Sequence, residues 1–194
     1  MPLAQSIQGC LEAQIGSAGL PQSSLDKHLA KLEPRLAALR EAYAKSTLPL
    51  LRVPERRGDI PPARDALKKL THSARTLVFF GTGGSSLGGQ TLAQLGGWAI
   101  PGDDKHGSEE RPRTRFYDNL DARTLELALS GLDLKSTRFV VISKSGGTPE
   151  TLVQIMAAIE AVRKAGLANR IPELFLAVTE PAVPGKANGL RALC

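Results

Sequence analysis

The sequence predicts an α/β protein built around a parallel β-sheet that helices cover on both faces. From residue 76 onward, short runs of β-forming residues alternate with helical patterns, and two of the runs lead directly into glycine-containing loops. Apolar residues make up 42% of the chain and aromatic residues only 4%. A core of Leu, Ala, Val and Ile suits layered α/β packing better than an all-β sandwich. Strands that alternate with helices imply parallel pairing and right-handed crossovers.

The 194 residues are predicted to form an N-terminal helical segment over residues 1–72 and an α/β domain over residues 73–194. Apolar residues three and four positions apart predict helices over 24–46 and 63–71. The predicted strands of the domain cover residues 76–80, 115–117, 138–142 and 173–178. Its predicted helices cover residues 86–98, 122–129, 149–164 and 186–193, and residues 101–113 form a charged loop.

Two details of this pattern can be tested against a structure. In the helix over 149–164, Leu152, Met156, Ile159 and Val162 are predicted to form the buried stripe. After the fourth strand come Pro181, Pro184, a short helix and no further strand. A doubly wound sheet usually continues beyond such a helix, so we expect the domain to be incomplete, or truncated, at its C-terminus.

Charge and cysteine content exclude several classes of protein. Lys and Arg number 25 against 19 Asp and Glu, and these basic residues are scattered, so we expect no nucleic acid partner. Cys10 and Cys194 lack metal-ligand spacing, and no secretory signal is apparent, which favours free thiols in a cytoplasmic protein without a metal. No apolar run approaches the roughly 18 residues of a membrane span, so no membrane partner is expected.

The first loop, Gly81-Thr-Gly-Gly-Ser-Ser-Leu-Gly-Gly89, lies between a predicted strand and a predicted helix. Glycines allow a ligand to approach the backbone, and the N–H groups at a helix start attract anions. A second interpretation, a dinucleotide-binding loop, is not excluded: Ser86 would replace the last glycine of that motif, and Asp118 would be the acidic residue that binds the ribose. A P-loop is excluded because no lysine follows Gly89. A simple tight turn with Ser85 as N-cap is the third reading.

The second loop, Ser143-Lys-Ser-Gly-Gly-Thr-Pro-Glu-Thr151, also follows a predicted strand. Thr148 is predicted to be the N-cap and Pro149 the first helical residue. Three hydroxyls, one lysine and two glycines within six residues suit a phosphate dianion, although each hydroxyl alone could serve as a cap or turn. Both loops leave the carboxyl ends of parallel strands, where such sheets bind ligands.

These two loops resemble those of the glucose-6-phosphate isomerase family. The first loop is similar to the family's Gly-x-Gly-Gly-Ser-x-Leu-Gly, and the second to its Ser-Lys-Thr-x-x-Thr-x-Glu-Thr. Val178-Thr-Glu-Pro181 is similar to the segment after the family's next strand, and the order agrees over roughly residues 75–194. The resemblance implies a sugar isomerase (SIS) domain, which is a flavodoxin-like three-layer sandwich.

The resemblance also implies a phosphate site, with Glu150 in a supporting role near the active site. Ser145 stands where the family has threonine, and Gly146 and Gly147 replace bulkier residues. The family's catalytic glutamate, histidine, lysine and arginine come later in its chains, so we expect no catalytic residue and little or no turnover in these 194 residues alone. The implied phosphate ligands are Gly84, Ser85, Ser143, Lys144, Ser145 and Thr148.

Three functions therefore remain to be weighed. The first is glucose-6-phosphate isomerase, the aldose–ketose isomerase of glycolysis and gluconeogenesis, for which the resemblance implies a sugar-phosphate substrate, no cofactor and a homodimer of the full-length protein. The second is an SIS module that binds a phosphosugar without chemistry. The third is a dinucleotide-binding domain. A base that moves a proton between C2 and C1 would distinguish the first from the second.

Overall fold

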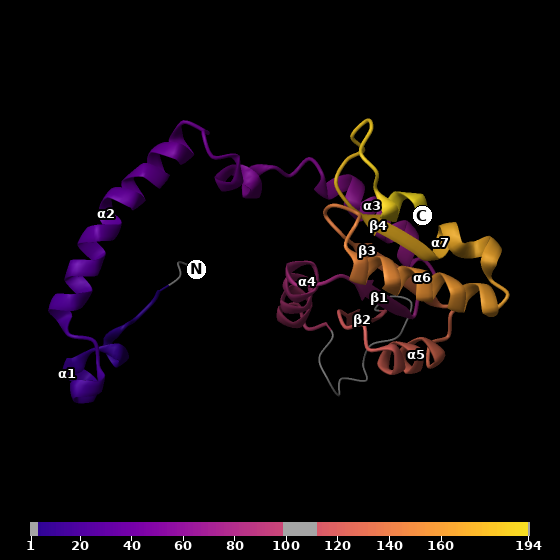
Figure 1. Ribbon diagram of the computed structural model, residues 1–194, viewed down its shortest axis with the longest axis horizontal. Coiled ribbons are helices and arrows are strands. Elements are labelled where there is room, and N and C mark those ends of the chain that lie inside the picture. Colours follow the sequence, from indigo (N-terminus) through magenta and orange to yellow (C-terminus); the bar gives the residue numbers. More distant parts are fainter. Residues whose placement is uncertain (1–3, 99–111, 194) are drawn as a thin grey trace. The chain divides into compact units, whose positions relative to one another are not determined.

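Figure 1 shows the computed structural model, which describes residues 4–98 and 112–193. The chain divides into two compact units, Met1–Pro61 and Pro62–Cys194. Most of the predicted charged loop, with His106, lies outside the described residues, as does Cys194. Each unit is described by itself below.

The first unit contains the long helix α2 (Gln22–Ala44), which confirms the predicted helix and begins two residues earlier. Shorter turns precede and follow it: η1 (Gln8–Cys10), α1 (Glu12–Ile15), η2 (Gly16–Ala18) and η3 (Pro49–Glu55). Arg52 of η3 lies over the Tyr43 ring, 3.8 Å from its centroid, and donates to the Tyr43 carbonyl oxygen at 2.7 Å. The Tyr43 hydroxyl donates to Glu55, so one polar cluster fixes the turn after α2.

The second unit is built on four parallel strands: β1 (Thr76–Phe80), β2 (Arg113–Tyr117), β3 (Thr137–Ile142) and β4 (Phe175–Val178). Their order is β2-β1-β3-β4, which confirms the predicted parallel α/β sheet. The predicted start of the fourth strand is wrong. Glu173 and Leu174 belong to the helical turn α7 (Ile171–Leu174), because Pro172 in its first turn favours helix and Leu174 is fully buried there.

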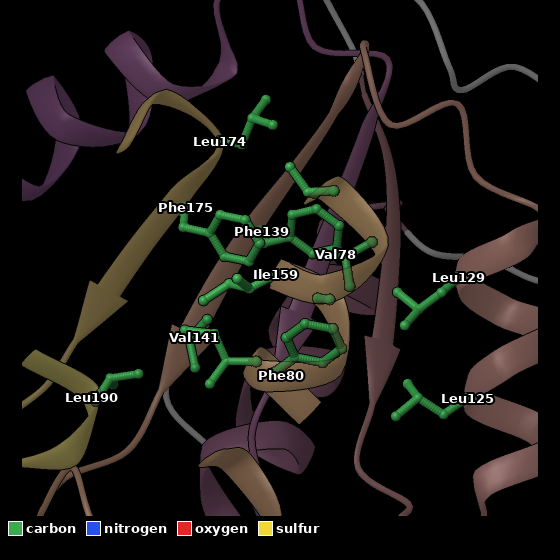
Figure 2. Packing of buried hydrophobic residues seen from close by; sticks show 13 residues of the cluster. Val78, Phe80, Leu125, Leu129, Phe139, Val141, Ile159, Leu174, Phe175 and Leu190 are labelled. Carbon is green, nitrogen blue, oxygen red and sulfur yellow. The ribbon is translucent and has the colours of Figure 1, made fainter. Parts of the chain in front are cut away.

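Helices cover both faces of the sheet. Successive side chains of a strand point to opposite faces, and neighbouring residues of β1 and β3 are buried, so both faces need cover. Val78, Phe80, Phe139 and Val141 point into the larger core, against α5 (Ala122–Ser130), α6 (Pro149–Lys164) and α8 (Gly189–Leu193) (Figure 2). On the other face, Leu77 and Val140 pack with Leu70 of α3 (Ile60–Thr71). There α4 (Gly84–Leu95) comes so close to β2 that a Cβ on Gly89 would lie 3.2 Å from the Phe116 ring.

The buried stripe of α6 differs from the predicted one. Ile155, Ala158, Ile159 and Val162 are buried, whereas the predicted Met156 is 49% exposed and Leu152 only partly buried. The stripe starts from Thr151 and continues at four- and three-residue steps, so Met156 falls about 100° round the helix from Ile155. The buried stripe therefore begins with a polar residue, Thr151, which a search for apolar residues at helical spacing does not find.

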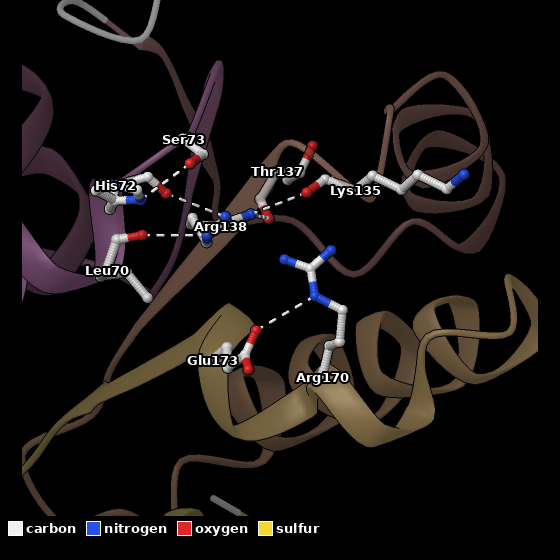
Figure 3. Close-up of polar contacts among 8 residues, drawn as sticks. All are labelled: Leu70, His72, Ser73, Lys135, Thr137, Arg138, Arg170 and Glu173. Atoms are coloured by element: carbon white, nitrogen blue, oxygen red, sulfur yellow. Dashed lines mark hydrogen bonds and ion pairs between the residues drawn. The ribbon is translucent and has the colours of Figure 1, made fainter.

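Arg138 joins β3 to the end of α3 (Figure 3). Its guanidinium is buried and donates to four carbonyl oxygens, those of Leu70, His72, Lys135 and Thr137, at 3.0–3.2 Å. Leu70 and His72 lie at the C-terminal end of α3, where helical carbonyl groups lack partners and the dipole favours a cation. Burial, and then the charge of Arg170, lower the pKa of Arg138 from its ordinary value.

Replacing Arg138 should therefore cost substantial stability. Arg138→Met keeps an apolar stem but leaves buried carbonyl groups unpaired, and we expect the free energy of unfolding to fall by about 2–4 kcal/mol. Urea denaturation followed by circular dichroism measures the change. The matched control is Arg123→Met, because the Arg123 side chain is 73% exposed and pairs with the equally exposed Glu126. We expect that control to cost less than about 1 kcal/mol, and equal losses in the two variants would contradict this account.

Candidate functional site

The two sequence-predicted loops leave neighbouring strands. Phe80 of β1 pairs with Val141 of β3, so Gly81 follows directly beside Ile142. A Cβ placed on Gly81 would lie 3.1 Å from the Ser85 Cβ and 3.3 Å from the Ile142 carbonyl oxygen. From β1 the chain continues to β2 on one side, while β3 and β4 lie on the other. The loops therefore flank the switch point, where open α/β sheets bind ligands.

The first loop turns sharply into α4. Gly83 is its N-cap, with a φ of 54°, a conformation that favours glycine, so the reading of Ser85 as N-cap is wrong. The Gly83 and Gly84 N–H groups have no acceptor within the part of the chain that the structure describes. Ser85 is half-buried, and Ser86 points inward, where it accepts from Gln90 at 2.8 Å and lies 3.5 Å from Asp118. Ser85 and the glycine amides thus remain for a ligand.

The second loop is tied together by its own hydroxyl groups. The Ser143 side chain is buried, lies 2.9 Å from the Thr148 hydroxyl and accepts from the Gly146 N–H at 3.1 Å. Ser145 is exposed and accepts from the Gly147 N–H at 3.2 Å. Lys144 is 88% exposed and lies 3.8 Å from Glu180. Glu150 is exposed in the first turn of α6.

The two helices that follow the loops, α4 and α6, start without a side-chain cap. Thr148 is the N-cap of α6, as predicted, but its hydroxyl contacts Ser143 instead of the first turn. By contrast, Asp121 caps α5, accepting from the Thr124 N–H at 2.7 Å. Hydrogen bonds from Thr124 hold the pKa of Asp121 below its usual value. The uncapped starts of α4 and α6 leave the positive ends of two helix dipoles available to an anion.

A segment after β4 packs onto the second loop, and no local pattern in the sequence predicts this contact. Leu190 N–H donates to the Gly146 carbonyl at 2.9 Å, and Glu180 N–H donates to that of Lys144 at 3.0 Å. Asn188 donates to Thr179 at 3.0 Å and lies against the Cα of Gly146, whose φ is 67°. A pocket of about 200 Å³ lies here, with Ser145, Lys186 and Arg191 among the residues that line it.

The structure thus gathers the predicted site residues at one edge of the sheet. Gly84 and Ser85 lie on the β1 loop, and Ser143, Lys144, Ser145 and Thr148 on the adjacent β3 loop. His28 is in α2 of the first unit, and His72 lies at the opposite, amino-end edge of the sheet. Within the described ranges, no three His, Cys, Asp or Glu side chains form a cluster that could hold a metal ion.

Fold and site together define an α/β domain with a flavodoxin-like sheet and two hydroxyl-rich loops at its switch point. The family model for phosphoglucose isomerase matches residues 66–189, which contain both loops and all four strands. The chain belongs to the phosphoglucose isomerase family. Among residues 4–98 and 112–193, no helix is both long enough and apolar enough to cross a membrane.

Curated relatives carry the name of the same enzyme. A glucose-6-phosphate isomerase of Citrifermentans bemidjiense is 41% identical over 98 residues, which is 50% of this chain and 17% of that enzyme. One from Carboxydothermus hydrogenoformans is 28% identical over 177 residues, 90% of this chain and 37% of the enzyme. The chain therefore spans less than half the length of these relatives.

Solved structures agree on the fold. A hypothetical protein from Thermus thermophilus superposes with a TM-score of 0.63 at 24% identity, covering 88% of this chain and 39% of that one, and this similarity concerns the fold alone. A glucose-6-phosphate isomerase from Chlamydia trachomatis superposes with a TM-score of 0.50 at 30% identity, covering 63% of this chain and 23% of that one.

Adjacent glycines of the second loop should respond differently to substitution. In Gly146→Ala the new methyl group would overlap the Asn188 side chain at an unfavourable φ, so we expect a loss of about 1–3 kcal/mol in the free energy of unfolding. In the control, Gly147→Ala, the nearest atom is 3.9 Å from the new Cβ. That variant should change by less than about 1 kcal/mol in the same urea titration. Similar losses at both positions would show that Asn188 does not pack on this loop.

Proposed function

We propose that this chain holds the phosphate group of a hexose 6-phosphate at the β1 and β3 loops, as part of a glucose-6-phosphate isomerase. One observation carries the proposal: two hydroxyl-rich loops and two uncapped helix starts lie together at the switch point of the sheet. The family match supports the identity of the reaction, which interconverts glucose 6-phosphate and fructose 6-phosphate in glycolysis and gluconeogenesis.

The proposed phosphate ligands divide between backbone and side chains. The free N–H groups of Gly83 and Gly84 suit phosphate oxygens, and the Ser85 and Ser145 hydroxyls can donate from either side. Lys144 supplies a positive charge once it turns from Glu180, from which it is 3.8 Å away. Ser143 and Thr148 bond to each other, so we assign them to shaping the loop as well as donating to the ligand.

The role of this region is to bind and orient the substrate. Aldose–ketose isomerisation needs a base that carries a proton between C2 and C1 and a positive group near the enediolate oxygen. Glu150, exposed at the start of α6, is a supporting residue in the proposal rather than that base. We therefore expect the 194 residues alone to bind the sugar phosphate with little or no turnover. A cytoplasmic location is proposed from the glycolytic family alone.

Two other functions must be distinguished from this proposal. An SIS module without chemistry would bind the sugar phosphate equally well, and only activity of the full-length protein distinguishes it. A dinucleotide domain would use Asp118 for the ribose. The Asp118 carboxylate, however, lies 3.5 Å from the buried Ser86 hydroxyl. Ser86 also stands where the dinucleotide motif has its final glycine, so both residues count against this function.

Isothermal titration calorimetry with fructose 6-phosphate tests the proposal. The unmodified chain should bind with a stoichiometry of one, and Ser145→Ala should bind about tenfold more weakly, because one hydrogen bond to a charged ligand is lost. Ser130→Ala, which removes an exposed hydroxyl on α5, is the matched control and should leave the affinity unchanged.

A parallel titration with NAD completes this experiment. The proposal predicts no saturable heat with NAD and a clear response to the sugar phosphate. Binding of NAD together with silence toward fructose 6-phosphate would overturn it in favour of a dinucleotide site.

A further inference from the structure

A second cavity lies at the edge of the sheet opposite the two loops. It has a volume of about 1300 Å³ and lies between the end of α3, the entry to β3 and the turn formed by η4 (Ala168–Arg170) with α7. All of its lining residues belong to the second unit. The strands that separate the two edges have about five residues each, which corresponds to roughly 16 Å. A ligand in this cavity would not touch the β1 and β3 loops.

Positive charge dominates the lining of this cavity. Asp65 and Glu173 are its carboxylates, and His72 is its histidine. The cationic residues among those that line it are Lys68, Lys69, Lys135, Arg138 and Arg170. The apolar walls come from Leu70, Pro172, Phe175 and Leu176. A cavity with this mixture suits a small molecule that carries an anionic group on a less polar body.

Two arginines face each other in this cavity. Figure 3 shows the Arg170 guanidinium extending toward Arg138, and its charge contributes to lowering the Arg138 pKa. Arg138 is 5% exposed and donates to carbonyl oxygens. Arg170 uses Nε for Glu173 at 3.3 Å, and its two terminal nitrogens have no acceptor among the described residues. Like charges that line one cavity favour an anion that bridges them.

We propose that this cavity, at the amino ends of β1 and β3, is a second anion site that takes a small phosphate-bearing molecule. The planar fork of Arg170 can donate two parallel hydrogen bonds to phosphate oxygens. Lys135, in the turn before β3, also lines the cavity and adds positive charge to it. Arg138 is a positioning residue, since its N–H groups are engaged by backbone and its contribution is charge. The site is independent of the proposed sugar-phosphate site.

Inorganic phosphate is the probe for this proposal, followed residue by residue in ¹⁵N–¹H NMR spectra of the 194-residue chain. Sodium chloride at matched ionic strength serves as the blank. The Nε–H signal of Arg170 and the amide signals of residues 135–138 and 170–173 should shift and saturate together. Arg170→Gln keeps one amide donor but loses the charge and the second hydrogen bond, so the affinity measured from those amides should fall about tenfold. Lys135→Gln, at an exposed position, should give a smaller loss.

Three control variants separate this site from general charge effects and from the other loops. Glu173→Gln removes the carboxylate that competes for Arg170 and should strengthen binding. Arg163→Gln lowers the net charge equally but lies on an exposed position of α6, and Ser145→Ala alters the proposed sugar-phosphate site, so neither should affect these signals. Shifts that do not saturate, shifts confined to residues 81–86 and 143–148, or an equal weakening by Arg163→Gln would overturn the proposal.

Discussion

The pairing of β1 with β3 is the constraint on which the rest of the second unit depends. These strands adjoin in the sheet although β2 separates them in the sequence, and their register runs from Thr76↔Thr137 to Phe80↔Val141. That register places the Gly81 and Ser143 loops side by side, and it sends Val78, Phe80, Phe139 and Val141 to one core. A slip by one residue would reverse every side chain. The stacked rings of Phe80 and Phe139, with centroids 5.7 Å apart, oppose such a slip.

At this edge of the sheet, the hydroxyl groups of the second loop bond to each other instead of capping the helix that follows. A threonine at an N-cap usually satisfies its own helix, and an unmade cap costs about 1 kcal/mol. Here the Thr148 hydroxyl contacts Ser143 instead, and Gly83 offers no side chain at all. The stability forgone at two helix starts is consistent with a site that an anion completes. The opposite edge differs: there a side chain, Arg138, does bond to the end of a helix, α3, and cationic residues outnumber carboxylates around it.

Strands and loops could be predicted from the sequence because their signals are local. Buried β-forming runs next to glycines defined β1 and β3, and the two hydroxyl motifs defined the loops. The contact of Asn188 with Gly146 was missed because it joins residues far apart in the chain and leaves no local pattern. The stripe of α6 was misplaced because Thr151 and Gln154 are buried polar residues. The hydrogen bonds of Arg138 to the end of α3 could not be predicted either, because a single arginine in a strand normally points to solvent.

The central claim is that the β1 and β3 loops grip one common phosphate group. A crystal structure of the chain grown with fructose 6-phosphate tests it most directly. The account predicts a phosphorus atom between the two loops, with its oxygens within hydrogen-bonding distance of both the Gly84–Ser85 backbone or hydroxyl and the Ser145 side of the second loop. A phosphate held by one loop alone, or by neither, would contradict it.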